Sequence, residues 1–234
     1  MTGQETEERA HGYYNEGYFD GGQTVSNYFH YGHSLTSDLR YGLSALHLIV
    51  ETRGFRALLE RDRLEISIVD LGGAKGLLAS AFQKVLPGAR VLNTDLSLYA
   101  TQNTVPEART FRSDIRNLPL PDESFHIVTC VDVLEHLRGD TVPKALLEIR
   151  RILKQGGFGI LVPNIGEDEA WSKDKSHVTI KGREWWKERI IESGLEIAEE
   201  TRLGRALMGL SNTYLFKRIS FPSISPGLFI VRKS

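Results

Sequence analysis

Several features that mark secreted or membrane proteins are missing from this chain of 234 residues. It has one cysteine, Cys130, so an intramolecular disulfide is excluded and we expect a buried structural thiol. No apolar run approaches the length of a membrane span, and the polar, acidic stretch MTGQETEERA does not resemble a secretory signal. We therefore expect a cytoplasmic protein without a membrane partner.

An excess of charge of one sign is also missing. Lysine and arginine together number 29, against 30 acidic residues. Nucleic-acid-binding proteins usually carry a clear basic excess, so we expect no nucleic-acid partner. The one uneven stretch is 201–234, which has six basic residues and no acidic one. Such a run usually forms the solvated face of terminal strands, and the alternative is an anion-binding surface.

What the chain does have is an alternation of strand-like and helix-like segments from residue 66 onward. Such an alternation predicts an α/β fold with a mostly parallel sheet covered on both faces. The last strand follows a long connection without a helical stripe, which indicates an antiparallel return. The expected strands are 66–70, 90–95, 110–112, 125–131, 158–163, 195–202 and 228–232. The expected helices are 75–86, 98–103, 142–153 and 184–193, with a turn at 154–157.

The residues before the first strand form a different kind of segment. Residues 1–34 are rich in glycine and aromatic residues, and leucines at helical spacing follow over 35–50. We treat 1–62 as a lid segment and helix packed on the core, and 63–234 as that core, within a single domain. The aromatic residues either wall a substrate site or only pack the helix onto the sheet; the candidates for the first role are Tyr18, Tyr28 and Tyr31.

The sequence VDLGGAKG, at 69–76, is the most informative stretch. A strand stops at Asp70 and turns through Gly72, Gly73 and Gly76 into a helix. This is how nucleotide-binding α/β sheets begin, because glycine lets the backbone adopt positive φ or approach a ligand closely. The spacing is not that of the dinucleotide motif GxGxxG, since Ala74 stands at the second glycine position. A nicotinamide-dependent oxidoreductase is therefore disfavoured.

Three carboxylates stand where this architecture places a ligand, outside the carboxyl ends of the strands. Asp70, Asp95 and Asp114 follow the first, second and third expected strands. Asp95 is placed to accept hydrogen bonds from ribose hydroxyls, and Asp114 from an exocyclic amine such as that of adenine. Asp70 can hold the backbone amides of the turn or an ammonium group of the ligand. The alternative is that each residue only caps a helix or a turn.

Five motifs, spread over about 66–200, resemble in order those of the class I S-adenosylmethionine-dependent methyltransferases. They are VDLGGAKG, NTDLS at 93–97, SDIRNLPLPDESFHIV at 113–128, CVDVLEHL at 130–137 and RRILKQGGFGILVPN at 150–164. The resemblance implies a Rossmann-like three-layer sandwich whose seven-stranded sheet ends in an antiparallel strand. It also implies S-adenosylmethionine as the cofactor.

The resemblance assigns cofactor contacts by position in this sequence. It assigns Gly72, Gly73 and Gly76 to the methionine part, Asp95 to the ribose, Leu96 to the adenine face, Asp114 to the adenine amine, Ile115 to a ring nitrogen and Asp132 to the methyl-transfer site. Arg40 is a candidate to pair with the cofactor's carboxylate.

Two residues depart from the family pattern. Ala74 replaces the usual middle glycine, and His126 replaces the usual aspartate after Phe125. Alanine is tolerated there if φ is negative and strained if φ is positive. His126 lies in the expected fourth strand, away from the ligand edge, and we interpret it as structural.

Methyl transfer requires alignment of the reacting atoms and, for some acceptors, a base. The candidate bases are His136, which follows Glu135 after the fourth strand, and His177. The alternatives are that His136 only packs and that His177 contacts the substrate. We expect no metal, because the chain has neither an HExxH motif nor a Cys/His cluster, and the pair His30 and His33 is a weak signal.

We therefore expect methyl transfer from S-adenosylmethionine to O, N or C of a small-molecule acceptor. One alternative is a non-catalytic member of the fold that only binds the cofactor. The other is a nucleic-acid methyltransferase, which would favour a basic face or an added binding domain.

Overall fold

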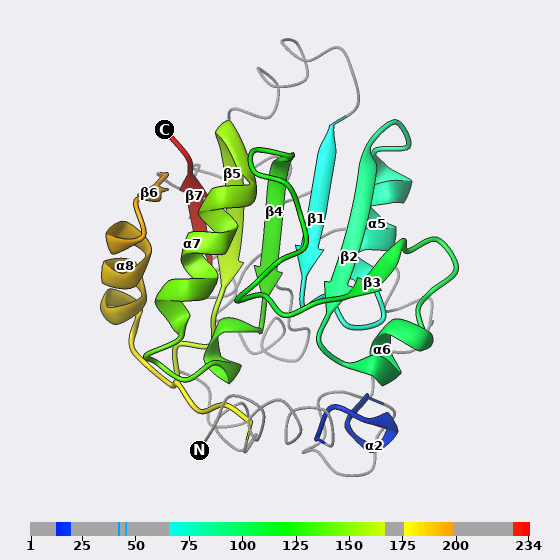
Figure 1. Cartoon of the computed structure of the whole chain (residues 1–234), viewed down its shortest axis with the longest axis horizontal. Coiled ribbons are helices and arrows are strands. Elements are labelled where there is room, and N and C mark those ends of the chain that lie inside the picture. Colours follow the sequence, from blue (N-terminus) through cyan, green and yellow to red (C-terminus); the bar gives the residue numbers. More distant parts are fainter. Residues whose placement is uncertain (1–12, 20–41, 43–44, 46–65, 167–175, 199–226) are drawn as a thin grey trace, which may run out of the picture.

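The computed structural model describes residues 13–19, 42, 45, 66–166, 176–198 and 227–234, which form one sheet covered by helices (Figure 1). The strand order is β3-β2-β1-β4-β5-β7-β6. The strands are β1 (Ser67–Leu71), β2 (Arg90–Asp95), β3 (Thr110–Arg112), β4 (Phe125–Val131), β5 (Leu153–Val162), β6 (Glu196–Ile197) and β7 (Phe229–Arg232). Strands β1 to β5 pair in parallel, whereas β7 is antiparallel to both β5 and β6. The predicted fold class is confirmed.

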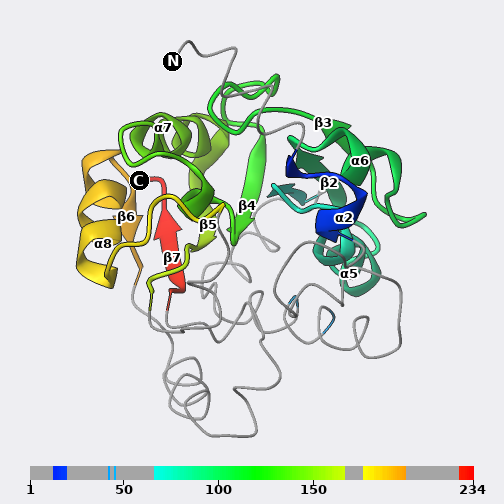
Figure 2. The same ribbon diagram turned by 90° about the horizontal axis from the view of Figure 1, so that it is seen from below.

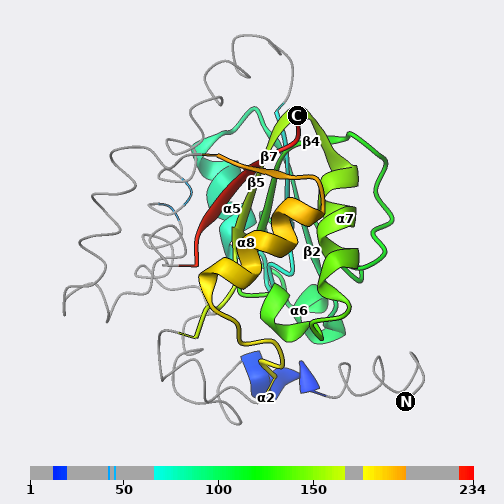
Figure 3. The same cartoon turned by 90° about the vertical axis from the view of Figure 1, so that its left-hand side faces the viewer.

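Helices cover both faces of the sheet (Figure 3). Helix α5 (Leu77–Val85) lies on one face, and α7 (Val142–Ile152) and α8 (Arg183–Glu192) lie on the other. The described residues also form α2 (Glu16–Phe19), α6 (Leu98–Gln102) and the 3-10 turn η1 (Leu134–His136). Within the described segments, no helix has the length and apolarity needed to cross a membrane.

Two apolar clusters form the core, one on each face of the sheet. Alternate residues of a strand point to opposite faces, so Ile68 joins the cluster under α5 while Val69 joins the one under α7 and α8. The same alternation divides Ile127 from Val128 in β4. Central strands buried on both faces need unbroken apolar runs, which explains why the sequence located β1 and β4.

The expected turn at 154–157 is wrong, because these residues belong to β5. Helix α7 ends at Ile152 and the strand begins at the next residue. The register then jumps from the pair Phe125 and Leu153 to the pair Ile127 and Phe158, so extra residues bulge from the strand. They are held by the chain end, where Gly156 N donates to Lys233 O at 2.8 Å. A partner so distant in sequence gives no local signal.

The other expected elements agree with the structure to within one or two residues at most ends. The expected strand 195–202 is described only as far as 198, where β6 covers two residues, Glu196–Ile197. The expected helix over 35–50 lies outside the described residues except at Gly42 and Ala45, which are both helical.

Arg151 in α7 fixes the loop 113–124 beside the sheet. Its guanidinium donates to the backbone oxygens of Leu118 at 3.1 Å and Leu120 at 2.8 Å, and it pairs with Glu148 and Asp122. Glu148 in turn accepts from Leu118 N at 2.7 Å. The loop that carries Asp114 is therefore anchored to a helix rather than only to its own ends.

Replacing Arg151 by methionine, which keeps the apolar stem, should lower the free energy of unfolding by about 2–3 kcal/mol, because several charge-assisted hydrogen bonds are lost together. Urea unfolding measures this change. The control is Lys144→Met on the same helix, which is exposed and should change stability by less than about 0.5 kcal/mol. Equal effects of the two variants would show that Arg151 does not anchor the loop.

Candidate functional site

The carboxyl ends of β1, β2 and β4 meet at one edge of the sheet, at the bottom of Figure 1. The turn after β1 is bound to the end of β2 by three hydrogen bonds. Gly73 N donates to Thr94 O at 3.0 Å, Ala74 N donates to Asp95 Oδ2 at 2.9 Å, and Asn93 Nδ2 donates to Ala74 O at 3.0 Å. The turn is therefore held at the ligand edge before any ligand binds.

The glycines of this turn are needed for backbone conformation and for space. Gly72 has φ +69° and Gly76 has φ +82°. A Cβ on Gly72 would lie 2.4 Å from a methyl carbon of Val133, and one on Gly73 would lie 2.2 Å from Asp70 Oδ2. These distances are shorter than van der Waals contact, so the turn packs directly against the chain that follows β4 and against Asp70.

Ala74, which replaces the usual middle glycine, also has a positive φ of +50°. Its backbone is therefore strained. Its side chain is 5% exposed and packs in a small cluster with Tyr18, Phe19 and Ala100. The buried methyl group compensates part of the strain. It also binds the N-terminal segment to the turn: Figure 2 shows α2 beside α6, and the two helices are in contact.

Gly72→Ala should lower the free energy of unfolding by about 1–3 kcal/mol, because it combines positive φ with a clash in a packed site. Ala74→Gly is the matched control. This substitution relieves about 1 kcal/mol of backbone strain but loses about 0.8 kcal/mol from burial of the methyl group. Glycine also increases the conformational entropy of the unfolded chain, so the free energy of unfolding should change by no more than about 1 kcal/mol. Thermal unfolding compares the two, and a larger loss for Ala74→Gly would contradict this account.

Asp70 lies beneath the turn and is 2% exposed. Its Oδ1 accepts a hydrogen bond from Thr129 Oγ1 at 2.6 Å. Burial raises the pKa of Asp70 to about 7, the Thr129 bond opposes this rise, and the charge of Asp95 adds to it. The structure places Asp70 as predicted at the edge, while its contact with the ligand's ammonium group stays a prediction.

The raised pKa makes stability depend on pH. The folded state binds the Asp70 proton more tightly than the unfolded state does. The contribution of this proton to stability is therefore fully present below about pH 4 and is lost as the pH rises through about 7. Asp70→Asn should remove it, so the free energy of unfolding of the variant relative to wild type should rise from pH 4 to 7. The control is Asp140→Asn, at an exposed carboxyl whose pKa Arg138 lowers. Parallel curves for wild type and Asp70→Asn would contradict the raised pKa.

Asp95, the last residue of β2, uses both oxygens on backbone amides. Oδ2 accepts from Ala74 N, and Oδ1 accepts from Ser97 N at 2.8 Å. Burial raises the pKa of Asp95 and these hydrogen bonds oppose the rise. Each carboxylate oxygen has a second acceptor site, so the arrangement is compatible with the predicted ribose contact. Leu96 follows directly, and its predicted adenine contact stays a prediction.

Asp114 is engaged by its own turn. Its carboxylate forms an ion pair with the Arg116 guanidinium, and Oδ1 also accepts from Arg116 N at 2.8 Å. Burial favours a higher pKa, but the hydrogen bonds and charge of Arg116 hold the pKa of Asp114 below its ordinary value. Ile115 beside it is 8% exposed and belongs to the core. Asp114 is therefore a turn residue, and its role toward an adenine amine stays a prediction.

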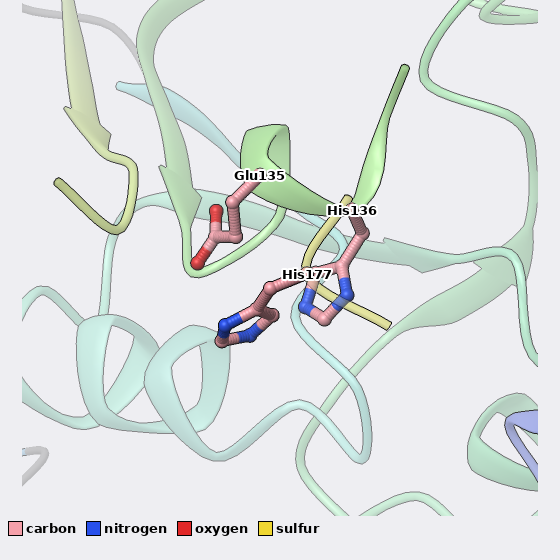
Figure 4. Close-up of side chains that lie close together, drawn as sticks. All are labelled: Glu135, His136 and His177. Carbon is pink, nitrogen blue, oxygen red and sulfur yellow. The ribbon is translucent and has the colours of Figure 1, made fainter. Parts of the chain in front are cut away.

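The segment after β4 brings the two candidate bases together (Figure 4). Glu135 O accepts from Val178 N and from Thr179 N, both at 3.0 Å, and Thr179 Oγ1 donates to Leu137 O at 2.6 Å across 42 positions of sequence. This backbone clamp places the His177 ring 4.6 Å from the His136 ring, centroid to centroid. The sequence analysis named the two histidines separately and could not predict their contact.

Tyr14 connects this region to the N-terminal segment. Its hydroxyl is hydrogen-bonded to His136 Nδ1 at 3.0 Å, and its backbone oxygen accepts from Ser97 Oγ at 2.6 Å. The sequence analysis proposed other tyrosines for a lid. Of these, Tyr18 is buried in the cluster around Ala74, whereas Tyr28, Tyr31 and Arg40 lie outside the described residues.

The residue after β4, Asp132, has φ +53°, and its backbone N donates to Val162 O at 2.9 Å. It turns the chain sharply toward Val133, which touches Gly72. The structure thus places Asp132 directly after β4, next in the chain to the residue that packs on the glycine turn. Its contact with the cofactor stays a prediction.

Comparison with known proteins agrees with this geometry. Residues 69–161 match the family model described as a methyltransferase domain. This match and the relatives below support a class I S-adenosylmethionine-dependent methyltransferase. Among relatives, YcgJ of Bacillus subtilis, named an uncharacterized methyltransferase, is 29% identical over 113 residues, 46% of this chain and 44% of the relative. A protein of Methanocaldococcus jannaschii is 33% identical over 101 residues, 43% of this chain and 42% of the relative.

These matches span less than half the length of the two relatives. Solved structures extend the similarity of this chain at the level of fold. The crystal structure of YcgJ has a TM-score of 0.52 at 19% identity, with 76% of this chain and 97% of that chain covered. Geranyl diphosphate C-methyltransferase from Streptomyces coelicolor, in complex with Mg²⁺, geranyl diphosphate and S-adenosyl-L-homocysteine, has a TM-score of 0.52 at 14% identity, with 76% of each chain covered.

Proposed function

We propose that the protein transfers a methyl group from S-adenosylmethionine to a small-molecule acceptor at the carboxyl edge of its sheet. The observation that carries the proposal is the glycine turn, closed onto the end of β2 by the bonds from Gly73 N and Ala74 N. A preformed turn of this kind binds a nucleotide-like cofactor without the entropic cost of ordering a loop. In this proposal, Asp95 binds the ribose and the turn from Gly72 to Gly76 holds the methionine part.

The methyl end of the cofactor then lies toward the segment after β4. Val133 packs on Gly72, and the residues that follow it lead directly to His136. Methyl transfer needs the acceptor, the methyl carbon and the sulfur in line, with water excluded. The Tyr13, Tyr14 and Tyr18 rings, which pack edge-on or tilted against one another, provide an apolar wall next to His136.

These rings favour one kind of acceptor. Aromatic rings with polar edges suit a small molecule that is partly apolar and partly polar. For an acceptor that must lose a proton, the proposed base is His136 or His177. Because His136 Nδ1 is hydrogen-bonded to Tyr14, its Nε2 is the nitrogen assigned to this role.

Calorimetric titration with S-adenosylmethionine tests the cofactor assignment. Asp95→Ala should weaken binding at least about tenfold, because it removes a charge-assisted hydrogen bond to the ribose and loosens the turn. The matched control is Asp140→Asn, which alters an exposed carboxylate paired with Arg138 and should leave binding unchanged. Undiminished binding by Asp95→Ala would contradict the ribose contact.

Failure of the wild-type protein to bind the cofactor would overturn the proposed function as a whole. If it binds, a screen of candidate acceptors for release of S-adenosylhomocysteine identifies the acceptor class. Turnover of an oligonucleotide and of no small molecule would overturn the small-molecule acceptor.

A further inference from the structure

We propose that Glu135, His136 and His177 form a binding site for a divalent transition-metal ion. Each residue offers one ligand atom, and these atoms all lie within 4.8 Å of one another. Figure 4 shows the two imidazole rings and the carboxylate gathered on one side of η1. The sequence predicted no metal, because the chain has neither an HExxH motif nor a Cys/His cluster.

The donor set determines which ions fit. One carboxylate and two imidazoles suit Zn²⁺, Mn²⁺ and Fe²⁺, whereas Mg²⁺ prefers oxygen ligands alone. Around an ion with bonds of about 2.1 Å, tetrahedral ligand atoms stand about 3.4 Å apart. Binding therefore needs the three side chains to approach by roughly 1 Å, which rotamer adjustment supplies. Three protein ligands also leave a coordination position open for water or an acceptor atom.

Two sets of contacts hold the ligands in place. The backbone oxygen of Glu135 accepts from Val178 N and Thr179 N, which fixes the position of His177 relative to η1. The Tyr14 hydroxyl is hydrogen-bonded to His136 Nδ1, which orients that ring and leaves Nε2 as the coordinating atom. Such outer contacts are the usual means by which proteins orient metal-binding histidines.

Burial favours a cation at this place. Glu135 is 0% exposed and His177 is 7% exposed. Transfer of a carboxylate out of water is costly, and coordination of a metal is one of the few arrangements that offset the cost. The three residues therefore combine suitable chemistry with proximity, and two of them are buried.

A bound ion would also restrict the methyl acceptor to a hydroxyl compound, an inference that rests on the proposed function. The site follows Val133, which touches the glycine turn, so its open position lies on the methyl side of the cofactor. An acceptor hydroxyl bound there loses its proton to water more readily. Its oxygen lone pair attacks the methyl carbon while the carbon–sulfur bond breaks onto sulfur, which yields the methyl ether and S-adenosylhomocysteine. In this arrangement the histidines are ligands rather than bases.

Direct metal binding tests the site without any need for activity. The full-length protein is treated with a chelator and titrated calorimetrically with Mn²⁺, Zn²⁺ and Mg²⁺. We expect one Mn²⁺ or Zn²⁺ per chain and weaker binding of Mg²⁺. Glu135→Gln and His177→Gln should each raise the Kd at least about tenfold, and Tyr14→Phe should raise it about tenfold through ring orientation. The matched control Glu192→Gln, at an exposed carboxylate on α8, should leave the Kd unchanged.

The proposal is overturned if the wild type binds no ion stoichiometrically, if both ligand variants keep wild-type affinity, or if Mg²⁺ binds more tightly than Mn²⁺. If a variant fails to fold, X-ray absorption spectroscopy of the wild-type protein loaded with Co²⁺ tests the site instead. A spectrum without two imidazole ligands would overturn the proposed site. Cofactor titrations run in parallel separate the two proposals. Cofactor binding without metal binding refutes only the site, and metal binding without cofactor binding refutes only the proposed function.

Discussion

The contact between the glycine turn and the strand ends on both sides of it is the constraint on which the site depends. On one side Gly73 N donates to Thr94 O and Asp95 accepts from Ala74 N. On the other side Gly72 meets Val133 with no room for a Cβ. Because β1 lies between β2 and β4 in a parallel sheet, one short turn joins the expected ribose side to the expected methyl side.

A second constraint, the backbone clamp at Glu135, determines the chemistry available at the methyl side. Its carbonyl oxygen binds the amides of Val178 and Thr179, and this brings His177 against His136. Tyr14 then connects His136 to the start of α6, so residues 13–19 form part of the same arrangement. Base catalysis and metal coordination are two uses of the same imidazoles, and they differ in whether a cation lies between them.

The fold could be predicted because the elements that define it carry local signals. The central strands β1 and β4 are mostly apolar and β-branched, and Asp70 followed by Gly72 marks the first βα turn. The bulge at 154–157 could not be predicted, because its partner Lys233 belongs to the far end of the chain. The sequence predicted strain at Ala74 only if its φ is positive, and the structure shows that φ is positive.

The sequence by itself determined the order of strands and helices along the chain, the resemblance to class I methyltransferases and the placement of Asp70 and Asp95 at strand ends, because these depend on periodicity and on residues close together in the chain. Only the tertiary structure decided that Asp114 pairs with Arg116 and that Glu135, His136 and His177 converge. The convergence depends on hydrogen bonds between backbone atoms some forty positions apart, from Val178 N and Thr179 N to Glu135 O. Backbone amides and carbonyls are the same in nearly every residue, so their pairing leaves no mark in the amino-acid sequence.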